Sequence, residues 1–539
     1  MIIIANNFDC KDKFMAFELT HLGQKIALPA EESHPVEGGF VARAPKLILN
    51  LPSAPIRFYR HGWQSWTLAS WIDPTMPVTP ISAPEFRAKD EDPLYAMSAN
   101  NVGAWVGAVE LPDDATLLVG ALNLGGRVTL EGTELTGFYE TGSGDWFVAL
   151  GREEQIFKRY AQLLGERLGT CRAAPLRVWC SWYSLYTLIN EKILSKTISG
   201  LGELPFDVIQ LDDGWQISTG DWEANKKFPS GMAAMAGKIQ KTGRIAGLWL
   251  SPFITTKSSS LFRDHQDWIL KDDEGKPVFA GMNFSGRIYA LDVSHPAVLD
   301  WLDNQLRKVR GWGFEYLKLD FLYAGALPGK HCEQKPREEI YRQALKVMRA
   351  AAGEAYLLVC GAPIVPSLGL CDGMRIGPDV TPYWLNVPMS VYLNNPNHPS
   401  TQNAIRTSLS RLWLKEIVQV DPDVVFFRSR VNTLKPYEKR LLLDMGEISG
   451  FKATSDLPQW LSTEDRQDLV DYLGNSPKVE RSSRYKFQID GREVDFSPVM
   501  PLPKEHKVHA KLASAMGLIQ MARGEVIPAV GEVLKDRFS

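Results

Sequence analysis

The stretch YLKLDFL (316–322) is a short apolar run broken by one lysine and one aspartate. Similar runs recur along the chain, and longer amphipathic stretches separate them: RVWCSWY (177–183), FDVIQLDD (206–213), IAGLWLSPF (245–253), AYLLVCGAP (355–363), GMRIGPDV (373–380) and EIVQVDPD (416–423). Apolar strands that alternate with helices are typical of a parallel sheet buried on both faces. With an eighth strand near 451–455, the pattern predicts a central (β/α)8 TIM-type barrel.

The stretches between these runs predict the barrel helices. They lie near 190–200, 231–242, 295–310, 336–353, 401–415 and 435–447. A doubly wound open sheet is the alternative arrangement of such units. The chain has neither a G-x-G-x-x-G after the first strand nor a phosphate-binding G-x-x-x-x-G-K-[ST], so the barrel is favoured.

The two flanks have different patterns. Before the barrel, short strands punctuated by turn residues predict an N-terminal β-sandwich, with strands at 45–51, 105–111, 115–122, 127–132 and 145–151. After it come a helix (463–473), a hairpin (483–499), the linker PLPKEHK and a helical stretch (508–536). We therefore expect a multidomain α/β and β protein with three domains: 1–170, 171–455 and a small, partly helical C-terminal domain, 456–539.

Composition narrows the class of function. The 539 residues are 45% hydrophobic and carry a net charge of −3, so the chain lacks the basic excess of a nucleic-acid binder. Its 16 Trp suit the stacking of sugar rings, although a Trp-rich core is the alternative explanation. No run is long enough to cross a membrane, and the first residues have no basic leader.

Cysteine usage bears on location. The six cysteines show no C-x-x-C pair and no zinc spacing: positions 10, 171, 180, 332, 360 and 371. Reduced thiols and a cytoplasmic location are the simplest interpretation. The sequence leaves the formation of a homo-oligomer open.

A barrel carries its active site at the carboxyl ends of its strands. The polar and aromatic residues there are Trp182, Asp212, Asp213, Trp249, Ser251, Lys318, Asp320, Cys360, Arg375, Asp379, Asp421 and Asp423. Carboxylates and tryptophans dominate, and the central strands contain no histidine. We therefore expect neither a metal site nor a cofactor.

Asp320 is the sharpest candidate. Its strand alternates, so Lys318 and Asp320 project to the same face, the barrel interior. A cation beside it predicts a depressed pKa and an ionised carboxylate, which suits a nucleophile toward a glycosidic carbon. A structural Lys–Asp pair is the alternative.

Three further acidic sites follow strand ends. Asp379 comes after Gly377-Pro378 and could supply the second, proton-holding carboxyl, or be a solvated turn residue. The vicinal Asp212 and Asp213 could accept hydrogen bonds from sugar hydroxyls, or form a turn. For Asp421-Pro-Asp423 the turn interpretation is favoured.

At these strands the sequence resembles the α-galactosidases of glycoside hydrolase family 36, mainly through residues 175–450. The matching strings include VIQLDDGW, AGLWLSPF, YLKLDFLYAGALPG, CGAP and DGMRIGPDV, with HGWQSW (61–66) ahead of the barrel. The family's members are retaining glycosidases with an N-terminal β-sandwich, a catalytic barrel and a small C-terminal β-domain.

The resemblance implies roles for individual residues. Asp320 resembles the nucleophile and Asp379 the acid/base. The expected sugar-binding residues are Asp212, Asp213, Lys318, Arg375, Trp182, Trp249 and Cys360, and Trp63, Gln64 and Trp66 resemble a loop laid over the pocket. The chain departs from the family after R-I-G-P-D, where it reads V-T-P-Y-W-L-N, before D-P-D, and in its helical last 35 residues.

The resulting prediction is a retaining exo-α-galactosidase acting on terminal α-D-galactosides through a covalent β-galactosyl-aspartate. An α-N-acetylgalactosaminidase and a galactosyl-transferring relative remain open within the class. A non-catalytic sugar-binding barrel is the alternative from another class, although a pure binder needs neither Asp320 nor Asp379.

Overall fold

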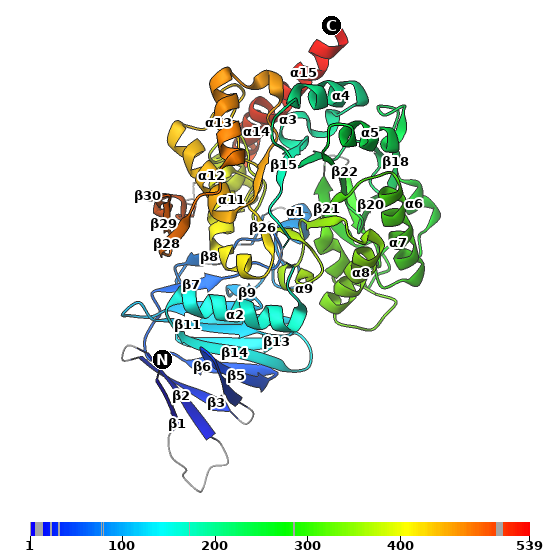
Figure 1. Ribbon diagram of the computed structural model, residues 1–539. Helices are drawn as coiled ribbons and strands as arrows, with labels where there is room; N and C mark the ends of the chain where they lie inside the picture. Colours follow the sequence, from blue (N-terminus) through cyan, green and yellow to red (C-terminus); the bar gives the residue numbers. More distant parts are fainter. Residues whose placement is uncertain are drawn as a thin grey trace.

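The chain forms an N-terminal region of β-sheets, a central parallel sheet surrounded by helices, and a C-terminal region of short strands and helices (Figure 1). The computed structural model describes residues 2–5, 15–21, 24–30, 33–76, 78, 80–82, 84–171, 173–283, 286–502 and 510–538. Cys10 and most of the PLPKEHK linker lie outside the described residues. The other five cysteines are free thiols. Free thiols alone do not show where a protein is located, so the predicted cytoplasmic location stays a prediction.

The central sheet has eight parallel strands in the order β26-β25-β24-β23-β19-β16-β15-β27. Their bounds confirm the predicted strands: β15 (Arg177–Cys180), β16 (Val208–Leu211), β19 (Ile245–Leu250), β23 (Tyr316–Leu319), β24 (Tyr356–Val359), β25 (Gly373–Arg375), β26 (Gln419–Asp421) and β27 (Lys452–Thr454). The two edges meet where Val425 bridges Thr454 and donates its N–H to the Ala453 carbonyl at 2.8 Å. This bridge closes the sheet into a ring and brings all eight carboxyl ends to one mouth.

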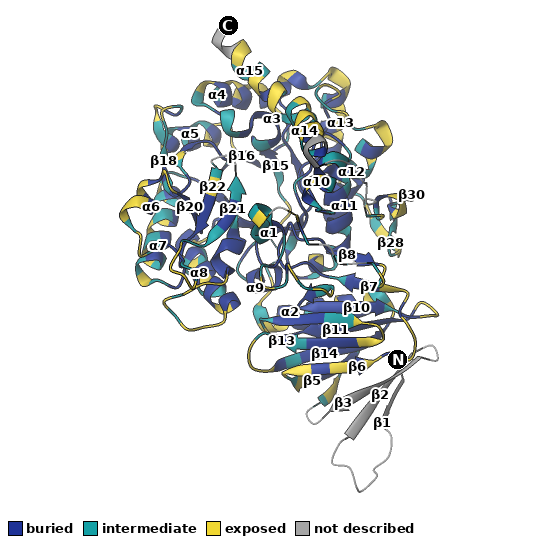
Figure 2. Ribbon diagram, turned by 180° about the vertical axis from the view of Figure 1, so that it is seen from behind, coloured by how far each residue is buried: buried dark blue, intermediate teal, exposed yellow. Residues whose placement is uncertain are grey.

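Helices surround the sheet, and most of them are exposed on the outside and buried toward the strands (Figure 2). The helices are α4 (Glu191–Leu201), α5 (Gly231–Gln240), α7 (Pro296–Gly311), α8 (Arg337–Ala352), α11 (Thr401–Ser410) and α12 (Pro436–Ser449). Among them, α11 differs in having no exposed residue. In α7, a proline in the first turn follows the capping residue His295, and the buried positions recur every three or four residues: Val298, Leu302, Leu306 and Val309.

The N-terminal region contains a seven-stranded antiparallel sheet, β4-β5-β14-β11-β10-β7-β8, and a four-stranded sheet, β6-β13-β12-β9. The predicted strands correspond to β6 (Lys46–Asn50), β10 (Val106–Glu110), β11 (Thr116–Ala121), β12 (Gly126–Glu131) and β14 (Gly144–Gly151). A three-stranded sheet, β1-β2-β3, precedes them: β1 (Ile2–Ala5), β2 (Met15–His21) and β3 (Gln24–Ala30). The other strands of the two larger sheets are β4 (Ser33–Val36), β5 (Gly39–Ala44), β7 (Arg57–Arg60), β8 (Ser70–Ile72), β9 (Val102–Ala104) and β13 (Glu134–Tyr139).

A helix absent from the sequence prediction, α2 (Glu153–Leu168), lies between the N-terminal sheets and the barrel (Figure 1). Its Phe157 and Tyr160 rings lie 6.0 and 5.5 Å from the Trp413 ring on the barrel side. The helix therefore helps to join the two regions through aromatic packing.

One buried arginine of the barrel region binds several carbonyls of the HGWQSW loop (61–66) and the carbonyl of Thr67, which follows it. Arg411, fully buried after α11, donates to the carbonyls of Gly62, Gln64, Ser65 and Thr67 at 2.7–3.0 Å. Because an arginine has five donors in a rigid fork, it can hold several carbonyls of a turn at once. The predicted helix over 401–415 is divided at this residue into α11 and a 3-10 helix, Leu412–Glu416.

After the barrel come α13 (Thr463–Gly474) and a small antiparallel sheet of β28 (Val479–Ser483), β29 (Lys486–Ile489) and β30 (Arg492–Asp495). The predicted terminal helical stretch is present as α14 (Ala510–Met521), a π-helical turn (Ala522–Val526) and α15 (Ile527–Phe538). The helix α14 packs on α10 (Val387–Leu393), and α15 on α3 (Trp182–Leu185), both of which follow barrel strands. No helix among the described residues is long and apolar enough to cross a membrane. The predicted domain boundaries stay a prediction.

Candidate active site

A cavity of about 480 Å³ opens at the carboxyl ends of the barrel strands. Strand-end residues form its floor. Its walls come from the HGWQSW loop with α1 (Pro84–Asp90), from β21 (Phe279–Asn283), from the segment that follows β25, and from the C-terminal helical segment. The site is therefore built from all three regions of the chain.

The floor is organised around Lys318, which is buried on β23. Its ammonium lies 2.9 Å from an oxygen of Asp212 and 4.0 Å from an oxygen of Asp320. Asp212 also accepts from the side-chain amide of Gln210 at 2.6 Å, and Asp213 accepts from that of Gln216 at 2.6 Å. The carboxylates that end two strands thus share one cation.

The pKa values of Lys318 and Asp213 on the floor are both raised, but for different reasons. Burial alone would lower the pKa of Lys318, but Asp212 and Asp320 outweigh it, so the pKa is raised well above its usual value. Burial raises the pKa of Asp213 to about 6, and the charges of Asp212 and Asp320 add to the effect. The floor therefore carries one fixed positive charge among three crowded carboxyls.

For Asp320 the predicted direction of the pKa shift was wrong. Its pKa is raised, because burial disfavours the charge more than Lys318 and the Trp249 hydrogen bond favour it. The reason is geometric, since Lys318 lies closer to Asp212 than to Asp320.

The Asp320 side chain is held in one orientation. One oxygen accepts from the Trp249 indole at 2.9 Å, and the other accepts from the backbone N–H of Phe321 at 2.8 Å. Phe321 has a φ of 55°, a left-handed conformation that is uncommon and costly for a bulky residue. Such strain concentrates at functional positions, and here it turns the chain directly after the carboxylate.

A second buried cation, Arg375 at the end of β25, lies beside the cavity. Its guanidinium pairs with Asp421 at 3.0 Å, Asp423 at 2.9 Å and Asp379 at 3.2 Å. Asp421 and Asp423 are buried, whereas the Asp379 side chain is 37% exposed. Arg375 and its two buried aspartates thus form a buried cluster, and the ion pair with Asp379 holds that carboxyl at the edge of the cavity. The turn interpretation of Asp421-Pro-Asp423 missed this buried pairing.

The sequence prediction missed Tyr183 and the tail residue Glu525, both of which line the cavity. The hydroxyl of Tyr183 donates to Asp423, and burial raises the pKa of Tyr183 well above its usual value. Glu525, in the π-helical turn, accepts from the Tyr383 hydroxyl at 2.7 Å. Burial raises the pKa of Glu525 to about 7. No motif pointed to Glu525, because its place depends on how a distant helix packs.

The predicted site residues divide into two groups. Eight line the cavity: Trp66, Trp182, Asp212, Asp213, Trp249, Lys318, Asp320 and Asp379. The described cavity lining does not include Trp63, Gln64, Cys360 or Arg375. The roles predicted for all twelve stay predictions.

The residues outside the lining have other surroundings. The Trp63 indole donates to Glu338 of α8 at 3.1 Å, and the Gln64 side-chain oxygen accepts from the Trp66 N–H at 2.7 Å. Cys360 is buried after β24, and burial raises its thiol pKa well above the usual value. Within the HGWQSW loop it is Trp66 that reaches the cavity, and its indole N–H has no hydrogen-bond partner among the described residues.

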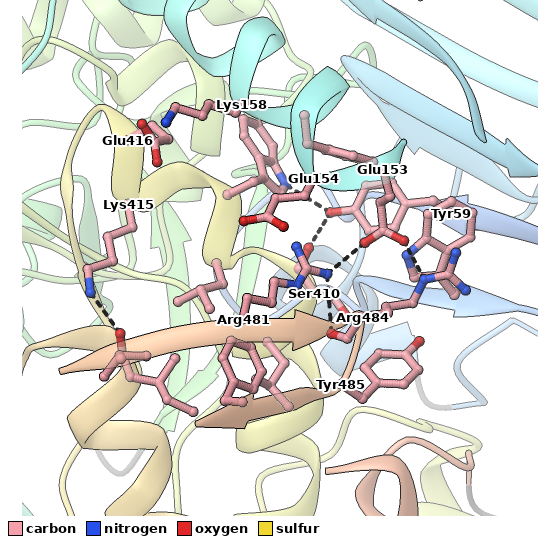
Figure 3. A pocket seen from close by; sticks show the side chains of 18 residues that line it. Tyr59, Glu153, Glu154, Lys158, Ser410, Lys415, Glu416, Arg481, Arg484 and Tyr485 are labelled. Atoms are coloured by element: carbon pink, nitrogen blue, oxygen red, sulfur yellow. Dashed lines mark hydrogen bonds and ion pairs between the residues drawn. The ribbon is translucent and has the colours of Figure 1, made fainter. Parts of the chain in front are cut away.

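Another pocket, of about 470 Å³, lies where α2, the 3-10 helix Leu412–Glu416 and the β28–β29 hairpin meet (Figure 3). Its charges are largely paired within the protein, since Arg481 and Arg484 both bind Glu153, and Lys415 donates to the Ile448 carbonyl at 2.8 Å. It lies away from the strand-end carboxylates, so it is a junction between regions rather than a second candidate for the reaction. Among the described side chains, no group of three His, Cys, Asp or Glu is arranged to hold a metal ion.

A parallel barrel whose mouth carries two carboxyls in unlike environments, with carboxylates, a lysine and tryptophans around them, defines the class of glycoside hydrolases. Comparison with known proteins agrees with this class. The family model described as Melibiase matches residues 155–352. A solved structure shows the α-galactosidase TtGalA from Thermus thermophilus in complex with p-nitrophenyl α-D-galactopyranoside. Its sequence is 44% identical to this chain, and the two structures match with a TM-score of 0.85 over 90% of this chain and 99% of that one.

Curated relatives are more distant. Alpha-galactosidase AgaA of Geobacillus stearothermophilus is 28% identical over 184 residues, which are 31% of this chain and 24% of that protein. Alpha-galactosidase 2 of Pediococcus pentosaceus is 30% identical over 149 residues, 26% of this chain and 20% of that protein. The matches thus span about a quarter or less of these relatives' length. The extensive match to TtGalA nevertheless shows the family: the chain belongs to the α-galactosidases of glycoside hydrolase family 36.

Proposed function

We propose that this chain hydrolyses terminal, non-reducing α-D-galactosides with retention of the anomeric configuration. The catalytic unit is the barrel, residues 171–455, covered by the N-terminal β-sandwich and the C-terminal helices. The proposal rests on family membership and on one observation in particular. Two carboxyls face a single cavity in unlike environments, because Asp320 is buried and clamped whereas Asp379 is 37% exposed. Carboxyls whose environments differ in this way commonly divide the nucleophile and acid roles.

In the first step, Asp320 attacks the anomeric carbon while Asp379 protonates the departing oxygen. The Trp249 and Phe321 hydrogen bonds hold the two oxygens of Asp320, so the attacking atom is positioned before the substrate arrives. The raised pKa of Asp320 makes its ionised form the stronger nucleophile.

In the second step, water attacks the same carbon from the face that the leaving group vacated. Asp379, now deprotonated, takes the proton from that water and is ready for the next cycle. Its partial exposure gives it access to solvent, and the Arg375 pair at 3.2 Å keeps its carboxyl at the cavity edge. Two inversions at one carbon give net retention.

The floor supplies the selection for galactose. In this proposal Asp212 and Asp213, which line the cavity, accept hydrogen bonds from the axial 4-hydroxyl and the 6-hydroxyl, and Lys318 donates to a ring hydroxyl. A site that buries carboxylates against a hydroxyl rejects sugars that leave them unpaired, by about 10⁴–10⁵ in known cases. We expect on the order of 10³ or more here, because the mouth of the barrel admits solvent.

A panel of nitrophenyl α-glycosides tests the proposal directly. The α-galactoside should exceed the α-glucoside in kcat/KM by about 10³ or more. Faster turnover of the α-N-acetylgalactosaminide would instead assign the enzyme to that substrate, and no turnover of any member would favour a sugar-binding protein. Proton NMR of the first product should show α-galactose, whereas initial β-galactose would mean inversion.

A further inference from the structure

The C-terminal helical segment presents one continuous face to the active-site cavity. Of its residues, Ser514, Leu518, Met521 and Glu525 line the cavity. Their spacings of four, three and four residues are those of a single helical face. The last of them lies in the π-helical turn Ala522–Val526, a kind of irregularity that is frequent at functional sites.

The segment is held over the barrel mouth by specific contacts. Asn386 donates to the Gly517 carbonyl at 3.2 Å, and Gln520 donates to the Leu385 carbonyl at 3.0 Å. A Cβ atom at Gly517 would lie 3.0 Å from the Cβ of Met389, so the helices approach at a glycine. Farther along, Glu532 accepts from the Trp460 indole at 2.9 Å. These contacts fix the cavity-facing residues in place.

Glu525 lies on the side of the cavity where Asp379, the proposed acid, also lies. The Tyr383 hydroxyl donates to one of its oxygens at 2.7 Å, and Tyr186 also hydrogen-bonds to the carboxyl. Tyr383 lies four residues after Asp379 in the segment that follows β25, and Asp379, Tyr383 and Glu525 all line the cavity. The proton donor of a glycosidase lies at the leaving oxygen, so Glu525 lies on the side where the leaving group departs.

We propose that Glu525 binds the leaving group, by a hydrogen bond to a hydroxyl of the sugar that is released. The inference rests on the proposed function, because it takes Asp379 as the acid. Leu518 and Met521 supply apolar contact for a sugar ring, and Glu525 supplies the polar contact that fixes its orientation. A half-buried carboxyl beside an open cavity is stabilised by a further hydrogen bond, which a hydroxylated leaving group provides and a nitrophenyl group does not.

The test compares two substrates that share the galactosyl group. Melibiose has a sugar leaving group, and p-nitrophenyl α-galactoside has an aryl one. At pH 8, above the Glu525 pKa of about 7, we expect Glu525→Ala to lower kcat/KM for melibiose about tenfold or more, as the loss of a hydrogen bond to a charged group predicts. The loss for the aryl substrate should be several times smaller. Glu525→Gln keeps the volume and an acceptor for Tyr383, so it serves if the alanine variant is unstable. Its neutral amide makes a weaker hydrogen bond than a carboxylate, so it should show the same trend with a smaller loss.

Glu532→Ala is the matched control. It removes a contact that holds the same segment, yet Glu532 is not among the described residues that line the cavity. Its ratio of melibiose to aryl activity should equal that of the wild type. Equal losses on both substrates in the Glu525 variants, or no loss on melibiose, would overturn this inference while leaving the proposed function intact. A wild-type enzyme inactive on both substrates would overturn both.

Discussion

The cavity lies beside two buried cations, and the two are used differently. Lys318 lies on the floor and lines the cavity, with Asp212 and Asp320 as its neighbours. Arg375 pairs with three aspartates, and only Asp379 among the described partners reaches the cavity. The Lys318 cluster can therefore contact the sugar directly, whereas the Arg375 cluster acts through the carboxyl that it holds.

The difference shows how two kinds of basic residue, each paired with aspartates, can serve different purposes: substrate binding for lysine and positioning for arginine. A lysine carries a compact charge with rotatable donors, which can be shared between protein carboxylates and a ligand hydroxyl. An arginine fork holds several carboxylates at fixed angles, so it suits a structural centre. The predictions below test this division, beginning with the largest expected effect.

Removing the nucleophile should abolish turnover. Asp320→Gly should lower kcat for α-galactosides by about 10⁴ or more while the protein stays folded, because no other described carboxylate is held as Asp320 is by Trp249 and Phe321. Azide should enter the vacated space, restore activity and give β-galactosyl azide. An α-configured azide, or full activity without azide, would remove Asp320 from this role.

Removing the acid should discriminate between leaving groups. Asp379→Ala should slow hydrolysis of alkyl galactosides by about 10²–10⁴, because their leaving oxygens need a proton. Nitrophenyl galactosides should lose far less, and the basic limb of the pH–rate profile should flatten. Equal losses for both substrate types would show that Asp379 is not the acid.

Removing the second cation should cost stability. Arg375→Met leaves Asp421 and Asp423 buried without their partner, which should lower the free energy of unfolding by about 3–5 kcal/mol. Denaturant titration measures the change. An unaltered free energy of unfolding would contradict the positioning role given to the Arg375 cluster.

A smaller effect is expected at the floor. Burial raises the pKa of Asp213 to about 6, so the folded state holds this proton more tightly than the unfolded chain. Its ionisation therefore costs stability as the pH rises from about 4 to about 6. Asp213→Asn should be more stable than the wild type by about 3 kcal/mol at pH 7 and nearly equal at pH 4, yet lose galactoside activity.

Thermal unfolding at both pH values checks this expectation. A variant that is less stable at pH 7 would mean that Asp213 serves chiefly to form the turn after β16. In that case the preference for galactose over glucose should also survive the substitution.

The sequence was sufficient for the parts of the site that local patterns determine. Each barrel strand is an apolar run, and the residue after it has a predictable place, so Asp212, Asp320 and the mouth of the barrel could be anticipated. Trp182 and Trp249 follow from the same reasoning.

The parts that depend on long-range packing could not be anticipated. Asp421 looked like a turn residue, and only the strand register that sets it opposite Arg375 makes it a buried partner. The direction of the pKa shift of Asp320 depended on how Lys318 divides its charge. Glu525 reaches the cavity because a helix far along the chain packs on the Tyr383 loop, where the sequence departs from the family pattern.

Trapping the glycosyl-enzyme tests the central claim most directly. A ring-fluorinated α-galactosyl fluoride should inactivate the wild-type enzyme in step with the formation of a covalent adduct. The ring fluorine slows both displacements through their oxocarbenium-like transition states, whereas the fluoride leaving group speeds only the first. Mass spectrometry of the digested protein should find the sugar on the peptide that contains Asp320. A label on Asp379 or on any other residue would contradict the account, as would rapid turnover of galactosides with release of β-galactose as the first product.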